Sequence, residues 1–170
     1  MSKNCNLFVI NYHINERWQS IIINILIHIT LGGLTMIKGI GHLALTVEDM
    51  DKSLEFYCGV LGFEKAFEIN DDDGNPWIVY VKVGAGQFIE LFYGGDNKQE
   101  ILTNQIGFNH LCLEVNDINE VANHIKMHGL QLDLEPKRGK DQNFQCWIKD
   151  PDGNRIEFMQ LVPSSPQMNC

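Results

Sequence analysis

The most informative stretch of the sequence is Gly41-His42-Leu43-Ala44-Leu45-Thr46-Val47-Glu48-Asp49. It recurs 68 positions later as Asn109-His110-Leu111-Cys112-Leu113-Glu114-Val115-Asn116-Asp117. A second stretch, Gly86-Gln87-Phe88-Ile89-Glu90-Leu91, recurs 67 positions later as Gly153-Asn154-Arg155-Ile156-Glu157-Phe158. Two matches at nearly the same offset indicate an internal repeat. Each copy carries one histidine near its start and one glutamate near its end.

Both copies show the same order of expected elements. Apolar and polar residues alternate from Ile40 to Val47, which is typical of a strand, and Asp49 is a natural N-cap for a following helix. Further strands are expected near Phe63–Ile69, Trp77–Val83 and Gln87–Tyr93. The second copy predicts a strand at Phe108–Val115, a helix from Asp117 to about His128, and strands near Leu130–Leu134, Phe144–Lys149 and Arg155–Leu161.

The repeat therefore predicts an α+β fold of two tandem βαβββ modules, residues 37–95 and 106–162, whose curved mixed sheets surround a cavity. The whole domain is expected to cover residues 36–162. Residues 1–35 are expected to be an N-terminal extension of uncertain order, and their apolar run from Ile21 to Leu31 is too short to span a bilayer, which needs roughly 20 apolar residues. A secretory signal would have basic residues directly before that run, but here Lys3 is far upstream and the charges of Glu16 and Arg17 cancel, so a signal peptide is not expected. Residues 163–170 are expected to be a flexible tail.

Composition narrows the possible partners. The chain has 170 residues, of which 44% are hydrophobic, and this is enough to bury a full core. Its formal net charge of −9 disfavours binding to nucleic acid or to an anionic membrane. The five cysteines are widely spaced without a CxxC motif, so a reducing, cytoplasmic location is expected rather than a disulfide framework. A small molecule is the expected partner.

Strand alternation brings four polar residues to one side of the predicted sheets. Leu43, Leu45 and Val47 should pack under the helix, which leaves His42 on the opposite face. The same reasoning places His110, Glu90 and Glu157 on that face of their strands. If the face curls inward, two imidazoles and two carboxylates line one cavity.

A divalent metal ion would explain this set of side chains. Buried carboxylates are costly unless they are paired, and two close carboxylates force one to bind a proton. Two nitrogen and two oxygen ligands suit Zn²⁺, Ni²⁺, Co²⁺, Mn²⁺ or Fe²⁺ and leave positions for water or substrate. The alternative is that each of these residues is simply a solvated or capping residue.

Strand alternation also predicts which residues form the pocket. The inward-facing set is Ile78, Tyr80, Phe88, Phe92, Gln145, Trp147, Arg155 and Met159. Such a largely apolar surface with a few polar groups is typical of ligand pockets, although the same aromatics could fill a barrel core. Arg155 could bind a carboxylate or phosphate, or form an ion pair with Glu114.

The two βαβββ units and the set His42, Glu90, His110 and Glu157 resemble the vicinal oxygen chelate superfamily. That group includes glyoxalase I, extradiol dioxygenases, methylmalonyl-CoA epimerase and fosfomycin- or bleomycin-resistance proteins. The resemblance covers about residues 37–162. Its strongest single match is Asp150-Pro151-Asp152-Gly153-Asn154-Arg155-Ile156-Glu157.

The four-ligand set is most similar to that of glyoxalase I. The resemblance implies a metal-dependent lyase or isomerase in which the cation stabilises an enediolate and a glutamate, Glu157 or Glu90, transfers the proton. Thr46 and Gly94 stand where glyoxalase I typically carries an Arg and an Asn that bind glutathione, which implies a different substrate or thiol.

Two alternative functions remain open. An extradiol dioxygenase would use two histidines and one glutamate on Fe²⁺, whereas Glu90 fills its open position here. A metal-free binding module of the bleomycin-resistance kind would lack the ligand set. Members of the family pair their modules within one chain or between chains, so a homodimer with a shared site is one of two possible arrangements.

Overall fold

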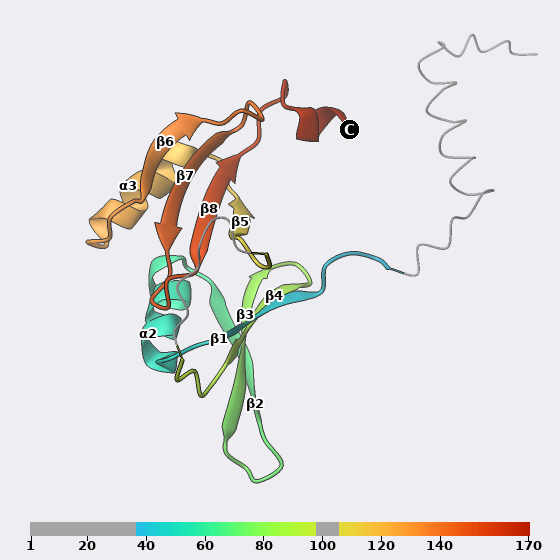
Figure 1. Cartoon of the computed structure of the whole chain (residues 1–170), viewed down its shortest axis with the longest axis vertical. Helices are drawn as coiled ribbons and strands as arrows, with labels where there is room; N and C mark the ends of the chain where they lie inside the picture. The colour runs from blue at the N-terminus through green and yellow to red at the C-terminus, as the bar shows by residue number, and fades with distance from the viewer. Residues whose placement is uncertain (1–36, 98–105) are drawn as a thin grey trace, which may run out of the picture. The chain divides into compact units, whose positions relative to one another are not determined.

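The computed structural model describes residues 37–97 and 106–170, so the expectations for residues 1–35 lie outside the described part. Each module forms a four-stranded sheet (Figure 1). The first sheet has the order β1-β4-β3-β2 and contains β1 (His42–Thr46), β2 (Glu64–Asn70), β3 (Pro76–Gly84) and β4 (Gln87–Phe92). The second has the order β5-β8-β7-β6 and contains β5 (Leu111–Glu114), β6 (Leu134–Arg138), β7 (Phe144–Lys149) and β8 (Arg155–Gln160).

The two sheets have the same mixed topology. The first strand of each module pairs in parallel with the last strand, β1 with β4 and β5 with β8. The remaining neighbours are antiparallel. A parallel pair requires a crossover connection, which in each module begins with the helix. The predicted α+β fold with two βαβββ modules is confirmed.

Both helices begin where the sequence predicts. Asp49 caps α2 (Met50–Leu54) by accepting a hydrogen bond from the Lys52 amide, and the helix continues as the π-helix η1 (Glu55–Val60). Asp117 caps α3 (Ile118–Met127) by accepting from the amides of Asn119 and Glu120. No helix in the described part of the chain is both long and apolar enough to cross a membrane.

One hydrophobic core joins the two modules. It combines Phe56 and Tyr57 of η1 with Ile118, Ala122 and Ile125 of α3. The sheet residues that complete it are Val79, Val81, Ile89, Leu91, Cys146, Ile148, Ile156 and Phe158. These residues recur at every second position along β3, β4, β7 and β8, so all of them lie on the side of the sheet that faces the helices. The opposite faces of both sheets stay outside this shared core.

A buried hydrogen bond fixes the turn between β7 and β8 to the first module. The Tyr57 hydroxyl donates to Asp150 Oδ2 at 2.7 Å, and Tyr57 is fully buried. Burial and the nearby Asp150 charge raise the pKa of the Tyr57 phenol, which therefore stays protonated. Asp150 also accepts from the amides of Asp152 and Asn154 and from Asn154 Nδ2. A buried carboxylate is tolerated when its oxygens are satisfied in this way.

The structure differs from the sequence-based expectation at two places. The expected strand Leu130–Leu134 instead begins at Leu134, while Leu130 and Leu132 pack against the core from the connection. Pro136 lies inside this edge strand, where a missing amide is tolerated. The segment 163–170, expected to be a loose tail, contains a 3₁₀-helix at Pro166–Asn169. Asn143 Nδ2 donates to Gln167 Oε1 at 2.7 Å and so ties this segment to the second module.

Replacing Tyr57 with Phe should lower the free energy of unfolding by about 1–3 kcal/mol, because Asp150 loses one buried hydrogen bond. Urea unfolding of the full chain measures this change. Tyr93→Phe is the matched control: its hydroxyl donates to the surface residue Glu68 at 3.3 Å, and its removal should change stability by less than about 0.5 kcal/mol. Equal effects of the two substitutions would contradict the role given to the Tyr57–Asp150 contact.

Candidate metal centre

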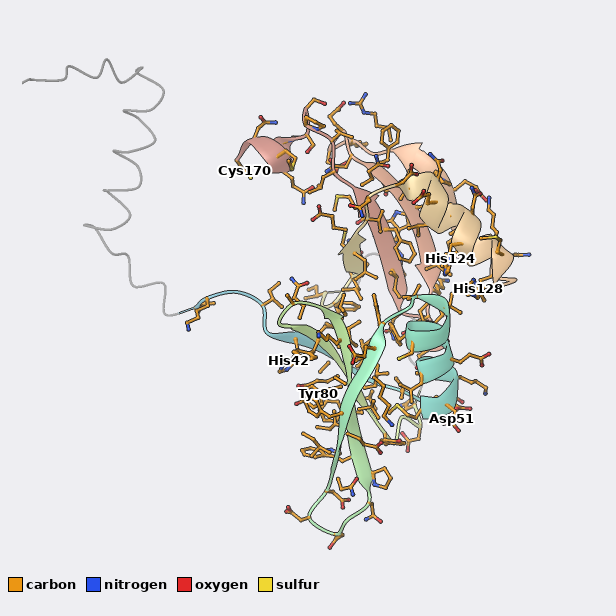
Figure 2. All side chains as sticks on the ribbon, turned by 180° about the vertical axis from the view of Figure 1, so that it is seen from behind. His42, Asp51, Tyr80, His124, His128 and Cys170 are labelled. Atoms are coloured by element: carbon orange, nitrogen blue, oxygen red, sulfur yellow. The ribbon has the colours of Figure 1, made fainter. Side chains whose placement is uncertain are left out.

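The first predicted pair of ligands lies on β1 and β4. The parallel register places Ala44 beside Glu90 and His42 beside Phe88, so His42 and Glu90 are diagonal neighbours on one face. His42 Nδ1 is 3.2 Å from Glu90 Oε1. The Glu90 side chain is 7% exposed, whereas that of His42 is 52% exposed. Figure 2 shows His42 and Tyr80 on the side of the first sheet away from α2. We call this side of each sheet, which carries its His–Glu pair, the ligand face.

The second pair occupies the equivalent place in the other module. His110 directly precedes β5, and the parallel register places Cys112 beside Glu157 of β8. His110 Nε2 is 3.1 Å from Glu157 Oε2. Burial and the neighbouring Glu157 carboxylate raise the pKa of Cys112 to about 12, so this thiol stays neutral beside the carboxylate. Each module thus contributes one imidazole and one carboxylate in contact.

Asn109 determines which nitrogen of His110 carries the proton. His110 Nδ1 is 2.8 Å from Asn109 Oδ1, and the same oxygen accepts from Arg155 Nη1 at 3.3 Å. A carbonyl oxygen can only accept, so Nδ1 donates, and in the neutral ring Nε2 holds a lone pair. That lone pair is 3.1 Å from a Glu157 oxygen. Two electron-rich atoms so close require a proton or a cation that both can bind.

The ligand face of the first module is aromatic. The Tyr80 ring stacks on Phe67 with centroids 4.2 Å apart, and Phe88 lies 6.2 Å from Tyr80. Phe92, next to this group on β4, meets Trp77 edge-on at 5.7 Å. A hydrogen bond to Glu90 raises the pKa of the Tyr80 phenol. Phe67 is 48% exposed, so within one chain part of this apolar surface is open to water.

The ligand face of the second module is more polar. Arg155 stacks on the Trp147 ring at 4.4 Å, and the His110 ring meets Trp147 at 4.7 Å. Trp147 Nε1 donates to Gln145 Oε1 at 2.6 Å, while Met159 Sδ accepts from Asn143 Nδ2 at 3.3 Å. The ion pair between Arg155 and Glu114 that the sequence left open does not form between these two residues. Arg155 binds Asn109 and Trp147 instead.

The structure brings the four predicted ligands together as two pairs. Within residues 37–97 and 106–170 of one chain, no group of three or more His, Cys, Asp or Glu side chains could hold a metal ion. The shared core explains why the two His–Glu pairs are separate, because it contains the helix-facing sides of both sheets and leaves each ligand face outside it. A common cation for all four residues therefore stays a prediction.

A cavity of about 510 Å³ is lined by residues of both modules. It is formed by Leu61, Phe63 and Val83 of the first module and by Val121, His124 and Ile125 of α3. None of the predicted pocket residues lines it. The expected pocket on the ligand faces also stays a prediction.

Sequence reasoning did not identify Asn109 as a site residue. The only signal was its position directly before His110, where the first copy of the repeat has Gly41. Because the two copies differ at this position, the repeat gives no indication of its role.

The sequence is similar to several proteins of one kind. A family model described as the Glyoxalase/Bleomycin resistance protein/Dioxygenase superfamily matches residues 39–158. A protein called probable lactoylglutathione lyase from Synechocystis sp. is 32% identical over 123 residues, which are 70% of this chain and 92% of the relative. A second probable lactoylglutathione lyase, from Vibrio parahaemolyticus, is 31% identical and covers 73% of this chain and 91% of its own length.

A solved structure supports the fold. The glyoxalase family protein from Enterococcus faecalis superposes with a TM-score of 0.65 at 24% identity, over 74% of this chain and 99% of that protein. The family match spans both modules, and its boundaries enclose both His–Glu pairs. The chain therefore belongs to the Glyoxalase/Bleomycin resistance protein/Dioxygenase superfamily.

Proposed function

We propose that this protein is a divalent-metal-dependent lyase or isomerase of the glyoxalase kind, with His42, Glu90, His110 and Glu157 as its metal ligands. The observation that carries the proposal is the presence of one contacting His–Glu pair at the equivalent place of each module. The relatives named lactoylglutathione lyase support the type of reaction. The substrate is a small oxygenated molecule.

The residues present fit a transition metal. Neutral imidazole nitrogen and ionised carboxylate oxygen are the donors that Zn²⁺, Ni²⁺, Co²⁺, Mn²⁺ and Fe²⁺ accept. The contact with Asn109 supports this assignment, since its Oδ1 can accept the Nδ1 proton of a neutral His110 ring and leave Nε2, which faces Glu157, with a lone pair for a metal. A hydrogen-bonded partner of this kind commonly orients a metal-binding histidine.

The complete site requires two copies of the chain. Each ligand face offers only half of the donor set, and the aromatic surface around Phe67 is exposed in one chain. In a symmetric dimer, the His42–Glu90 pair of one copy meets the His110–Glu157 pair of the other. Each dimer then holds two sites, and the exposed aromatic surface becomes buried.

The proposed reaction is a proton transfer next to a carbonyl group. The cation supplies positive charge that stabilises the oxyanion developing on the substrate. Glu157 or Glu90 takes the proton from the adjacent carbon and returns it to the neighbouring one. Tyr80 and Phe88 shield the reacting centre from water, and Trp147 does so from the second module.

The thiol that this protein uses differs from glutathione in our proposal. Thr46 and Gly94 occupy the places where glyoxalase I typically carries glutathione-binding Arg and Asn residues. Gly94 has a φ of 91°, a left-handed conformation that favours glycine over a residue with a side chain. An assay with methylglyoxal and several thiols, each with metal-reconstituted protein, identifies the co-substrate.

Glu157→Gln and Glu90→Gln should each lower the isomerase rate by on the order of 10²-fold or more, because glutamine cannot accept a proton. The rate is measured with metal-reconstituted protein, and metal content is determined alongside. Glu114→Gln, on the same ligand face but outside the donor set, is the control and should keep the wild-type rate. Near-wild-type rates in both test variants would refute the proton-transfer role. A protein that stays metal-free after reconstitution would favour the binding-module alternative.

Mixing His42→Ala with His110→Ala protein should restore activity that neither variant has alone. In a mixed dimer, one site loses both histidines and the other keeps all four ligands. Random exchange of subunits then gives about a quarter of the wild-type rate, because about half of the dimers are mixed and each has one intact site. No recovery after confirmed subunit exchange would show that the donors do not come from two copies.

Asn109→Ala should weaken metal binding by about 10–100-fold, because His110 loses the acceptor that sets its tautomer. Competition with a metallochromic chelator measures the affinity. Asn109→Asp keeps an acceptor oxygen and should bind more tightly than the alanine variant. Asn116→Ala, an exposed substitution just beyond β5, should leave the affinity unchanged. Equal affinities of the Asn109→Ala and Asn116→Ala variants would contradict the orienting role.

A further inference from the structure

We propose that Arg155 and Lys149 form a binding site for an anionic group, a carboxylate or a phosphate, at the β7–β8 edge of the second ligand face. The inference rests on the proposed function in one respect: it assigns the anionic group to the substrate or co-substrate of that site. The binding of the anion itself follows from the local geometry of these two cations.

Arg155 is held in place with most of its hydrogen-bonding capacity unused. Its guanidinium lies 4.4 Å from the centre of the Trp147 ring, and Nη1 donates to Asn109 Oδ1 at 3.3 Å. Stacking on an aromatic ring fixes the plane of the guanidinium and leaves its remaining N–H donors at the edge. In the described part of the chain, Arg155 forms no ion pair. Such a group is preorganised to bind an oxyanion through two parallel hydrogen bonds.

Lys149 lies directly opposite Arg155. The antiparallel register of β7 and β8 pairs these two residues, and paired residues project to the same face. Their neighbours Ile148 and Ile156 are buried on the helix side, which puts Lys149 and Arg155 on the ligand face. Like charges directly opposite one another in a sheet are destabilising. Among the described residues neither Lys149 nor Arg155 forms an ion pair, so two cations lie side by side at this corner without a paired carboxylate.

The first module shows that the repeat does not require this arrangement. Lys82 pairs with Phe88 at the corresponding place of β3 and β4, so a cation stands opposite an aromatic ring. Lys82 Nζ is also 4.0 Å from Glu64 Oε2. The paired cations are therefore specific to the second ligand face, in a chain with a net charge of −9. This contrast favours a role in recognition over one in folding.

The location sets the size of the ligand. Arg155 and Glu157 are two residues apart on one face of β8, which corresponds to about 7 Å along the strand. An anionic group bound by Arg155 thus lies a few bonds from a reacting carbon near Glu157. The inferred substrate class is a small carbonyl compound, or its thiol adduct, that carries a carboxylate or phosphate at that separation.

Anion binding to metal-depleted full-length protein tests the inference, because a bound metal would itself attract anions. Inorganic phosphate and propionate are titrated separately at constant ionic strength, and the indole N–H resonance of Trp147 reports binding. At least one anion should give a saturable shift. Arg155→Gln should weaken its binding at least about tenfold, and Lys149→Gln several-fold, since each removes a charge from the site. The anion whose binding saturates at the lower concentration, propionate or phosphate, identifies carboxylate or phosphate as the preferred group.

Lys82→Gln is the matched control and should leave anion binding unchanged. Arg155→Lys keeps the charge but loses the fork of donors, so its affinity should fall between those of the wild type and the Arg155→Gln variant. The inference is overturned if neither anion saturates, or if Lys82→Gln weakens binding as much as Arg155→Gln does. Neither isomerase activity nor metal content enters this measurement. Failure of the proposed function would therefore appear in the rate and metal assays and not here.

Discussion

Everything in this molecule depends on the two-residue alternation of side chains along its strands. On β3, β4, β7 and β8, every second residue enters the core that both modules share. The residues between them project to the other face, outside that shared core. In each sheet, the residues that stabilise the fold and the proposed metal ligands therefore lie on opposite faces. Apolar side chains on one face hold the domain together, and His42, Glu90, His110 and Glu157 stand on the other without contributing to that core.

The two ligand faces carry equivalent His–Glu pairs, but the side chains around these pairs differ. The first carries Phe67, Tyr80 and Phe88 around its His–Glu pair, and the second carries Trp147, Arg155 and Lys149 around the corresponding pair. If two copies of the chain bring these faces together, as we propose, the resulting site has one apolar wall and one cationic wall. Such a site would distinguish the two ends of an unsymmetrical substrate, which a perfect repeat could not do.

Much of the fold could be predicted from the sequence, because its signals are local. Neighbouring residues in the sequence are enough to indicate the aspartate caps Asp49 and Asp117, the alternation in β1, and the turn at Asp150–Gly153. The start of β6 was wrong because Pro136 argues against a strand and only its edge position makes it acceptable. The ties that hold residues 163–170 were missed because the Asn143–Gln167 contact joins residues far apart in the sequence. The membership of each His–Glu pair followed from alternation, whereas the relation between the pairs depends on packing that alternation does not encode.

The Asp150 turn has an additional effect on the chemistry of the second module. Its carboxylate holds the chain ends of β7 and β8 in place, and Lys149 and Arg155 are the first residues on either side of the turn that pair across it. The anchor of this turn, Tyr57, belongs to the first module. A shift of Tyr57 in the first module would therefore move Asp150 and change the distance between Lys149 and Arg155. It would also change the position of Glu157, which follows Arg155 on β8. If Arg155 and Lys149 bind the substrate as we propose, substitutions in the interior of the first module would alter substrate preference without changing any residue that touches the substrate.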